Sequence, residues 1–143
     1  MKKNQLEVDI KVPNQTRYLS LIGRIGEDIA KELGRYSGDR ETLAHHINVV
    51  LTEATANAIK YAGPDDREKM VHICITICAS ELLIRVFDHG QGFDINTIQT
   101  PNFDSLEDSG RGIFIIRSLM DSVTYKKLPK GNVLEMSKRL PPE

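Results

Sequence analysis

A chain of 143 residues with 40% hydrophobic and 27% charged residues is typical of one globular domain with its own core, so we expect a single domain over residues 1–143. The formal net charge of −1 argues against the basic footprint of a nucleic-acid-binding protein, and we expect no direct contact with nucleic acid. The charged N-terminus and the lack of a long apolar run predict a cytoplasmic protein without a membrane partner.

The two cysteines, Cys74 and Cys78, lie in one apolar run. In an extended strand their side chains are too far apart for a disulfide, and no third or fourth cysteine completes a zinc set. We therefore expect two reduced thiols beside a core, which is typical of the cytosol.

The N-terminal third predicts one strand followed by a helix. Hydrophobic and polar residues alternate strictly over residues 6–12, which predicts a half-buried strand. Hydrophobic residues then recur at helical spacing over residues 16–33, and Gly34 is placed to end that helix. Gly23 and Gly26 would weaken it by roughly 1 kcal/mol each relative to alanine, and they could instead allow close packing against a partner.

A longer helix is predicted from an N-cap at Asp39 to Ala62, where Gly63-Pro64 stops it. One face of this helix is hydrophobic, and it comprises Leu43, Ile47, Val50, Leu51, Ala54, Ala58 and Tyr61.

The second half of the chain predicts two β-hairpins separated by a loop and a helix. Residues 70–78 and 82–87 form the first hairpin, and residues 123–128 and 133–140 form the second. Residues 94–109 have no clean period and predict a long mobile loop, which leads through Gly110-Arg111-Gly112 into a helix over residues 113–121. The order of elements favours an α+β fold, a two-layer sandwich with a mixed, mostly antiparallel sheet and helices on one face.

Three segments carry residues that could do chemistry. They are Glu53-x-x-x-Asn57 on a helix, Asp88-x-Gly90-x-Gly92 at the end of a strand and Gly110-x-Gly112 at the start of a helix. Residues four apart share one helix face, so the carboxylate and the amide of the first segment point the same way. Each segment alone is weak evidence for a functional site, because turns also favour Asp and Gly. Their order, element types and spacing together favour a single pocket.

In these segments the chain resembles the GHKL (Bergerat-fold) ATPases, the superfamily of gyrase and histidine kinase catalytic domains. It is most similar there to the small bacterial anti-sigma factor serine kinases of partner-switching systems. L-T-E-A-T-A-N-A-I-K-Y-A resembles their N box, D-H-G-Q-G-F their G1 box and G-R-G-I-F-I-I-R-S-L-M-D their G2 box. The resemblance covers almost the whole chain and implies the Bergerat ATP-binding fold.

The resemblance also implies a site for ATP and Mg²⁺. Asn57 would be the magnesium ligand, since this ion prefers hard oxygen donors, and Glu53 would be the general base for the incoming hydroxyl. Lys60 could reach the phosphates, although a solvated lysine near a helix end is an equally good interpretation.

The glycine-bearing segments would bind the two ends of the nucleotide. Asp88 would accept a hydrogen bond from the adenine amine and so select ATP over GTP, and Gly90 and Gly92 would let the backbone approach the base. Gly110 and Gly112 would open a helix whose free N–H groups can hold phosphate. Residues 94–109 would be the lid.

Two positions depart from the family pattern. Asp108 stands where relatives often carry a basic residue that can touch the γ-phosphate, and we expect Arg111 to supply that charge. Asn132 follows Gly131 where relatives often have Thr, which weakens the idea that this turn helps to bind the nucleotide.

The leading hypothesis is an ATP-dependent protein serine/threonine kinase that phosphorylates a STAS-type anti-sigma factor antagonist, binds a sigma factor and forms a homodimer. The second is a non-catalytic nucleotide-binding module that controls a partner by docking. The third is a detached histidine kinase catalytic domain, which the missing phosphoacceptor hairpin and the short lid argue against. His45 and His46 are poorly placed as phosphoacceptors, since they lie near the start of the helix that builds the pocket.

Overall fold

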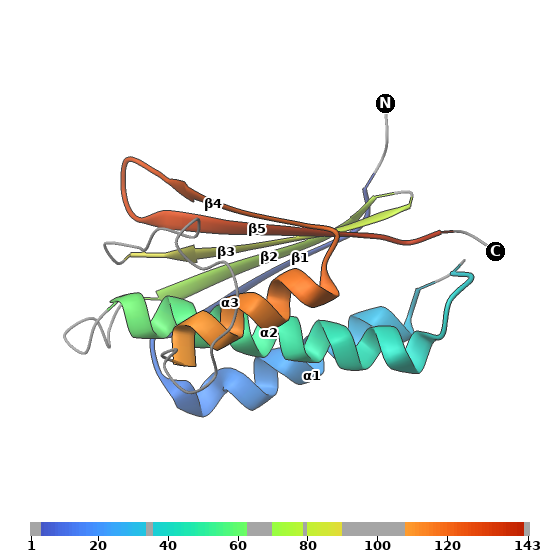
Figure 1. The fold of residues 1–143 in the computed structure, drawn as a ribbon, viewed down its shortest axis with the longest axis horizontal. Helices are drawn as coiled ribbons and strands as arrows, with labels where there is room; N and C mark the ends of the chain where they lie inside the picture. The colour runs from blue at the N-terminus through green and yellow to red at the C-terminus, as the bar shows by residue number, and fades with distance from the viewer. Residues whose placement is uncertain (1–3, 34–35, 63–69, 79, 90–107, 142–143) are drawn as a thin grey trace.

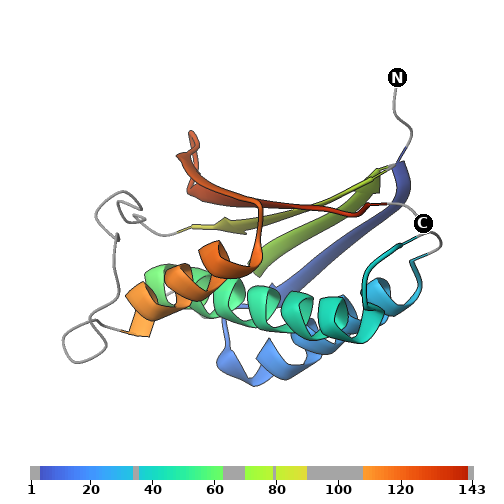
Figure 2. The same cartoon turned by 45° about the vertical axis from the view of Figure 1, so that its right-hand side comes forward.

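The computed structural model describes residues 4–33, 36–62, 70–78, 80–89 and 108–141. Its helices are a short 3-10 turn (Thr16–Tyr18), α1 (Leu19–Lys31), α2 (Arg40–Ala62) and α3 (Asp108–Leu119). Its strands are β1 (Asn4–Pro13), β2 (Met70–Cys78), β3 (Glu81–Asp88), β4 (Ser122–Lys127) and β5 (Asn132–Arg139). In two views the helices lie together on one side of the sheet (Figures 1 and 2). The predicted α+β sandwich with helices on one face is confirmed.

The five strands form one sheet in the order β1-β2-β3-β5-β4. Every pairing among the described strands is antiparallel, so the sheet is not mixed there as the sequence had suggested. β5 pairs with both β3 and β4, which leaves β1 and β4 at the two edges. The end of β3 therefore lies beside the start of β5, an arrangement that shapes the site described below.

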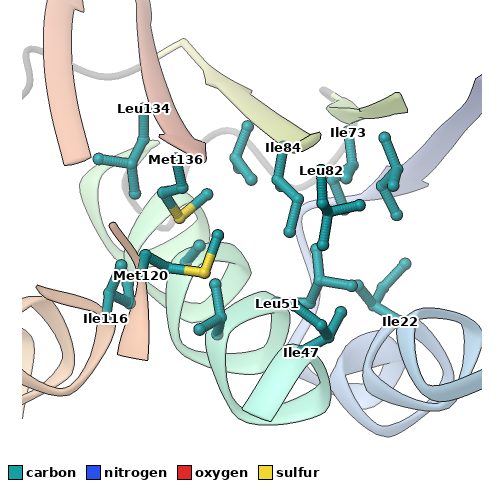
Figure 3. Packing of buried hydrophobic residues seen from close by; sticks show 14 of the residues in the cluster. Ile22, Ile47, Leu51, Ile73, Leu82, Ile84, Ile116, Met120, Leu134 and Met136 are labelled. Atoms are coloured by element: carbon teal, nitrogen blue, oxygen red, sulfur yellow. The ribbon is translucent and has the colours of Figure 1, made fainter. Parts of the chain in front are cut away.

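The core lies between the sheet and the helices, and side chains from both layers meet there (Figure 3). β2 shows the alternation that its sequence predicts, with Val71, Ile73, Ile75 and Ile77 buried and the intervening residues half-buried. α2 contributes fully buried residues such as Leu51, and α3 contributes Ile116. Burial of one apolar face from each element is what orients the helices on the sheet.

Gly23 and Gly26 are buried where α1 packs against α2. A β-carbon at Gly26 would collide with Leu51 and would lie 2.9 Å from Ile47 Cγ2, while one at Gly23 would lie 2.7 Å from Thr52 Oγ1. The two glycines therefore allow α1 to approach α2 closely. The close packing of these glycines that the sequence left open is therefore present, and the element they pack against is α2.

Asp39 caps α2 as predicted. Its Oδ1 accepts hydrogen bonds from the backbone N–H of Glu41 (3.0 Å) and of Thr42 (3.4 Å), and its Oδ2 accepts one from the Thr42 hydroxyl (3.0 Å). The predicted stop at Gly63-Pro64 lies outside the described residues. Among the described helices, none combines the length and hydrophobicity that a membrane crossing needs.

α3 begins at Asp108, five residues before the predicted start, and ends at Leu119. The prediction that Gly110-Arg111-Gly112 precedes the helix is therefore wrong, because these residues lie inside its first turns. Ile113 and Ile116 are fully buried, so docking of the helix on the core outweighs the intrinsic cost of two glycines. The predicted loop falls outside the described residues over residues 94–107.

Candidate functional site

Glu53 and Asn57 lie on the side of α2 that faces α3. Asn57 is 6% exposed and Glu53 is half-buried. A β-carbon added at Gly112 of α3 would lie 2.8 Å from Glu53 Oε2 and 3.5 Å from Asn57 Nδ2. The predicted N-box pair and the second glycine of the G2 segment are therefore in contact across two helices. Any side chain at position 112 would occupy the space that the Glu53 carboxylate uses.

The Asn57 amide is buried, and its Nδ2 has no hydrogen-bond partner among the described residues. A buried polar group without a partner costs roughly 1–3 kcal/mol, so such a group is generally retained for a reason. A flip of the amide exchanges its oxygen and nitrogen, so the side chain can present either atom at this place. An amide oxygen is a hard donor, and the residues present fit a magnesium ion in this respect.

Asp88 ends β3 and is 5% exposed. The Tyr125 hydroxyl donates a hydrogen bond to its Oδ2 (2.9 Å), and Asn132 Nδ2 donates one to its Oδ1 (2.8 Å). The β3–β5 register places Asp88 directly opposite Asn132, and Tyr125 reaches across from β4. A carboxylate oxygen has two lone pairs, so it can accept more than one hydrogen bond.

Tyr125 and Asn132 are the residues of this site that the sequence did not identify. In the sequence, Asn132 only weakens the idea that the last turn helps to bind the nucleotide, whereas in the structure it holds the carboxylate of Asp88. The signal that could have found both is the strand order, since only a β5 beside β3 brings them to Asp88.

The turn between β4 and β5 packs against the end of β3. Gly131 has a positive φ of 86°, and a β-carbon there would collide with the Asp88 carbonyl oxygen. Only glycine meets both conditions without strain. The backbone is therefore held against β3 at Gly131, directly before Asn132, whose side chain bonds to Asp88.

A small cavity lies between Asp88 of β3 and Asn57 of α2. It is lined by Ala54, Asn57, Ala58, Val86, Asp88, Tyr125 and Leu134. Ala54 and Ala58, two of the small residues beside the polar pair, therefore leave room between helix and sheet. Asn57 and Asp88, which lie on different layers, border the same space.

The other predicted residues lie around this core of the site or outside the described chain. Lys60 is exposed on the last turn of α2, and Arg111 is half-buried next to Gly112. Gly110 lies in the first turn of α3. Gly90 and Gly92 fall outside the described residues.

The C-terminal end of α3 is anchored to β5. Lys138 Nζ donates a hydrogen bond to the Leu119 carbonyl oxygen (2.7 Å), and the Asp121 backbone N–H donates one to the Ser137 carbonyl oxygen (2.9 Å). Asp121 Oδ2 accepts a hydrogen bond from the backbone N–H of Arg139 (2.6 Å). The trailing aspartate of the G2 segment thus joins the C-terminal end of α3 to the sheet.

Comparison with known proteins places the chain among ATPase domains. The model of the histidine kinase-like ATPase domain matches residues 12–138. The chain is 28% identical to the serine-protein kinase RsbW of Staphylococcus epidermidis over 152 aligned residues, which cover 100% of this chain and 92% of that protein. It is also 28% identical to the serine-protein kinase RsbW of Bacillus subtilis, over 98% of this chain and 89% of that protein.

Two solved structures share the fold. One is the SiaB-SiaC complex from Pseudomonas aeruginosa, with a TM-score of 0.57, 15% identity and coverage of 96% of this chain and 91% of that chain. The other is the histidine kinase domain of the EL346 blue-light activated histidine kinase from Erythrobacter litoralis, with a TM-score of 0.55, 20% identity and coverage of 90% and 62%.

Proposed function

The chain belongs to the histidine kinase-like ATPase domain family, and we propose that it acts as an ATP-dependent protein serine/threonine kinase on a STAS-type anti-sigma factor antagonist. The family and the kinase class were both predicted from the three motifs. The matched family model confirms the first, and relatives named serine-protein kinases confirm the second.

The contact of Glu53 and Asn57 with Gly112 is the observation that carries this proposal. A kinase of this class needs a carboxylate within hydrogen-bond reach of the hydroxyl that attacks the γ-phosphate. Glu53 is half-buried at the α2–α3 contact, where it can accept that proton. Asn57, one turn later, would hold Mg²⁺, which when bound neutralises charge on the phosphates.

The base of ATP would bind at the end of β3. Asp88 accepts hydrogen bonds from Tyr125 and Asn132, and these fix the direction of its carboxylate. An oriented acceptor suits the exocyclic amine of adenine and does not suit the carbonyl oxygen that guanine presents there. Gly90 and Gly92 would let the following backbone approach the base.

The phosphates would bind at the start of α3. Free N–H groups at a helix N-terminus favour anions, and Gly110 and Gly112 keep this end of the helix open to them. Arg111 would supply the positive charge that the family often places at the position of Asp108, and Lys60 is a second cation one turn from Asn57.

Phosphorylation would lower the affinity of the partner protein for this kinase. A phosphate on Ser or Thr adds roughly −1.5 to −2 charge and disrupts an interface by repulsion and by its desolvation cost. The kinase released in this way would bind a sigma factor, and we propose that it acts as a homodimer in the cytoplasm. Similarity to serine-protein kinases over the full chain length supports this place in a partner switch.

A pull-down from the source cell, with and without Mg-ATP, tests the function. We expect a STAS-type protein to be retained without ATP and to leave, phosphorylated on one Ser or Thr, when Mg-ATP is added. A Glu53→Gln bait is the matched control, and it should retain the same protein in both conditions. A partner that is retained by both baits and never phosphorylated would instead indicate a docking module.

A further inference from the structure

A second cluster of chemically active side chains lies on the face of the sheet opposite the helices, away from the site described above. It is formed by Asp9 of β1 and by His72 and Cys74 of β2. The β1–β2 register pairs Asp9 directly with Cys74, and it places His72 two residues along the same face. The three residues are therefore brought together by strand pairing and lie on the face of the sheet away from the buried core positions.

The three donor atoms form a small, nearly equilateral triangle. Asp9 Oδ1 lies 3.3 Å from His72 Nε2 and 2.9 Å from Cys74 Sγ, and Cys74 Sγ lies 3.3 Å from His72 Nε2. A point about 2.1 Å from all three atoms lies about 1 Å out of their plane, which is close to the geometry of three ligands in a tetrahedral zinc site. Shifts of a few tenths of an ångström would accommodate the longer bond from zinc to sulfur.

The surroundings hold the donors in this arrangement. The His72 ring stacks on Phe87 of β3, with ring centroids 5.2 Å apart and an interplanar angle of 21°, while its Nε2 lies at the cluster. The Asp9 side chain is 71% exposed, so the cluster opens to solvent and a water can take a fourth position. Such three-ligand sites with an open position are a common zinc arrangement.

Charges near the cluster do not exclude a cation. Glu7 and Lys11 flank Asp9 on β1 with opposite signs, and Arg85 lies opposite Cys74 on β3. The Arg85 guanidinium is partly neutralised by Glu135, at an Nε–Oε2 distance of 3.4 Å. Burial, together with the hydrogen bond to Asp9, raises the pKa of Cys74 to about 11, so a metal would have to displace the thiol proton.

We propose that Asp9, His72 and Cys74 bind a zinc-class transition-metal ion on the open face of the sheet. A thiolate and an imidazole select zinc and its neighbours, whereas the amide oxygen of Asn57 suits magnesium. The ion ties the edge strand β1 to β2, and it is independent of the nucleotide pocket. The number and spacing of the cysteines do not indicate this site, because its other two ligands are a histidine two residues away and an aspartate on another strand.

The test is Zn²⁺ binding to the purified full chain without nucleotide, measured by competition with a chromogenic chelator. Co²⁺ provides a second readout, through the visible absorption bands of a tetrahedral thiolate site. We expect Cys74→Ser to weaken Zn²⁺ binding at least about tenfold and to abolish the thiolate band. The matched control is Cys78→Ser on the same strand and the same face, which should bind like the wild type.

Equal binding by the wild type and Cys74→Ser, or equal loss in Cys74→Ser and Cys78→Ser, would overturn the assignment. Circular dichroism establishes that each variant is folded. If Cys74→Ser fails to fold, the pair His72→Gln and His45→Gln decides in the same way, because His45 is exposed on α2. Only the His72 variant should lose Zn²⁺, and retention by His72→Gln would contradict the proposal.

Discussion

Gly112 lies against the carboxylate of Glu53, so closely that a β-carbon at position 112 would lie 2.8 Å from Glu53 Oε2. The obstructed atom is the end of a flexible side chain, which can move aside without unfolding the protein. The glycine therefore determines where the carboxylate lies more than whether the helix forms.

Substituting Gly112 with Ala should lower kcat for phosphotransfer by roughly 10- to 100-fold, because a displacement of about 1 Å in a reacting group has an effect of that order. Steady-state kinetics and thermal unfolding on the same preparation would measure it. Ser118→Ala, an exposed change on the same helix, is the control. An unchanged kcat in Gly112→Ala would contradict the assigned position of the carboxylate.

Removing the amide that holds Asp88 should weaken nucleotide binding. Asn132→Ala leaves a buried carboxylate with one donor fewer, which should destabilise the fold by about 1–3 kcal/mol and reduce ATP affinity. Asn132→Thr should retain more affinity, since its hydroxyl can still donate. Calorimetric titration with ATP and with GTP would measure both effects. If Asn132→Ala binds ATP as the wild type does, Asp88 does not depend on this partner.

Arg111 is expected to compensate for Asp108 at the start of α3. Arg111→Ala should lower the rate of phosphotransfer by about tenfold or more, because charge near the transferred phosphoryl group stabilises the transition state. Arg117→Ala, on the last turn of the same helix, provides the control. Equal rates for Arg111→Ala and the wild type would exclude this role.

The cap of α2 should be visible in the pH dependence of stability. Hydrogen bonds from the side chain and backbone of Thr42 and from the backbone of Glu41 hold the pKa of Asp39 below its usual value of 3.8. The stabilisation is therefore fully present above that pH and is lost as the pH falls through the lower pKa of the folded state. Asp39→Ala should have a lower Tm at neutral pH, and the gap should close in strong acid. A gap that persists there would contradict this cause.

The described strands and the second helix follow from the sequence with little error, for a simple physical reason. Alternation in residues 70–78 reflects burial of one sheet face, and the cap of α2 at Asp39 follows from local chemistry. Local signals of this kind need no knowledge of the rest of the chain.

The start of α3 and the partners of Asp88 depend on tertiary structure. Two glycines lower the helix propensity around residue 111, so the sequence suggests a later start, but Gly112 packs against Glu53 of α2 and the helix begins at Asp108. Asn132 lies 44 residues from Asp88 in sequence, and Cys74 lies 65 residues from Asp9. Strand order and register create these contacts, and no local sequence pattern predicts them.

Under the proposed function, Glu53 makes this chain a kinase and not only a nucleotide-binding module. Transfer of the γ-phosphate from radiolabelled ATP to the retained STAS-type protein, compared between the wild type and Glu53→Gln, tests it most directly. Loss of a general base predicts a rate lower by about 10²- to 10⁴-fold at an ATP affinity within a few-fold of the wild type. A Glu53→Gln rate within about threefold of the wild type would contradict the account.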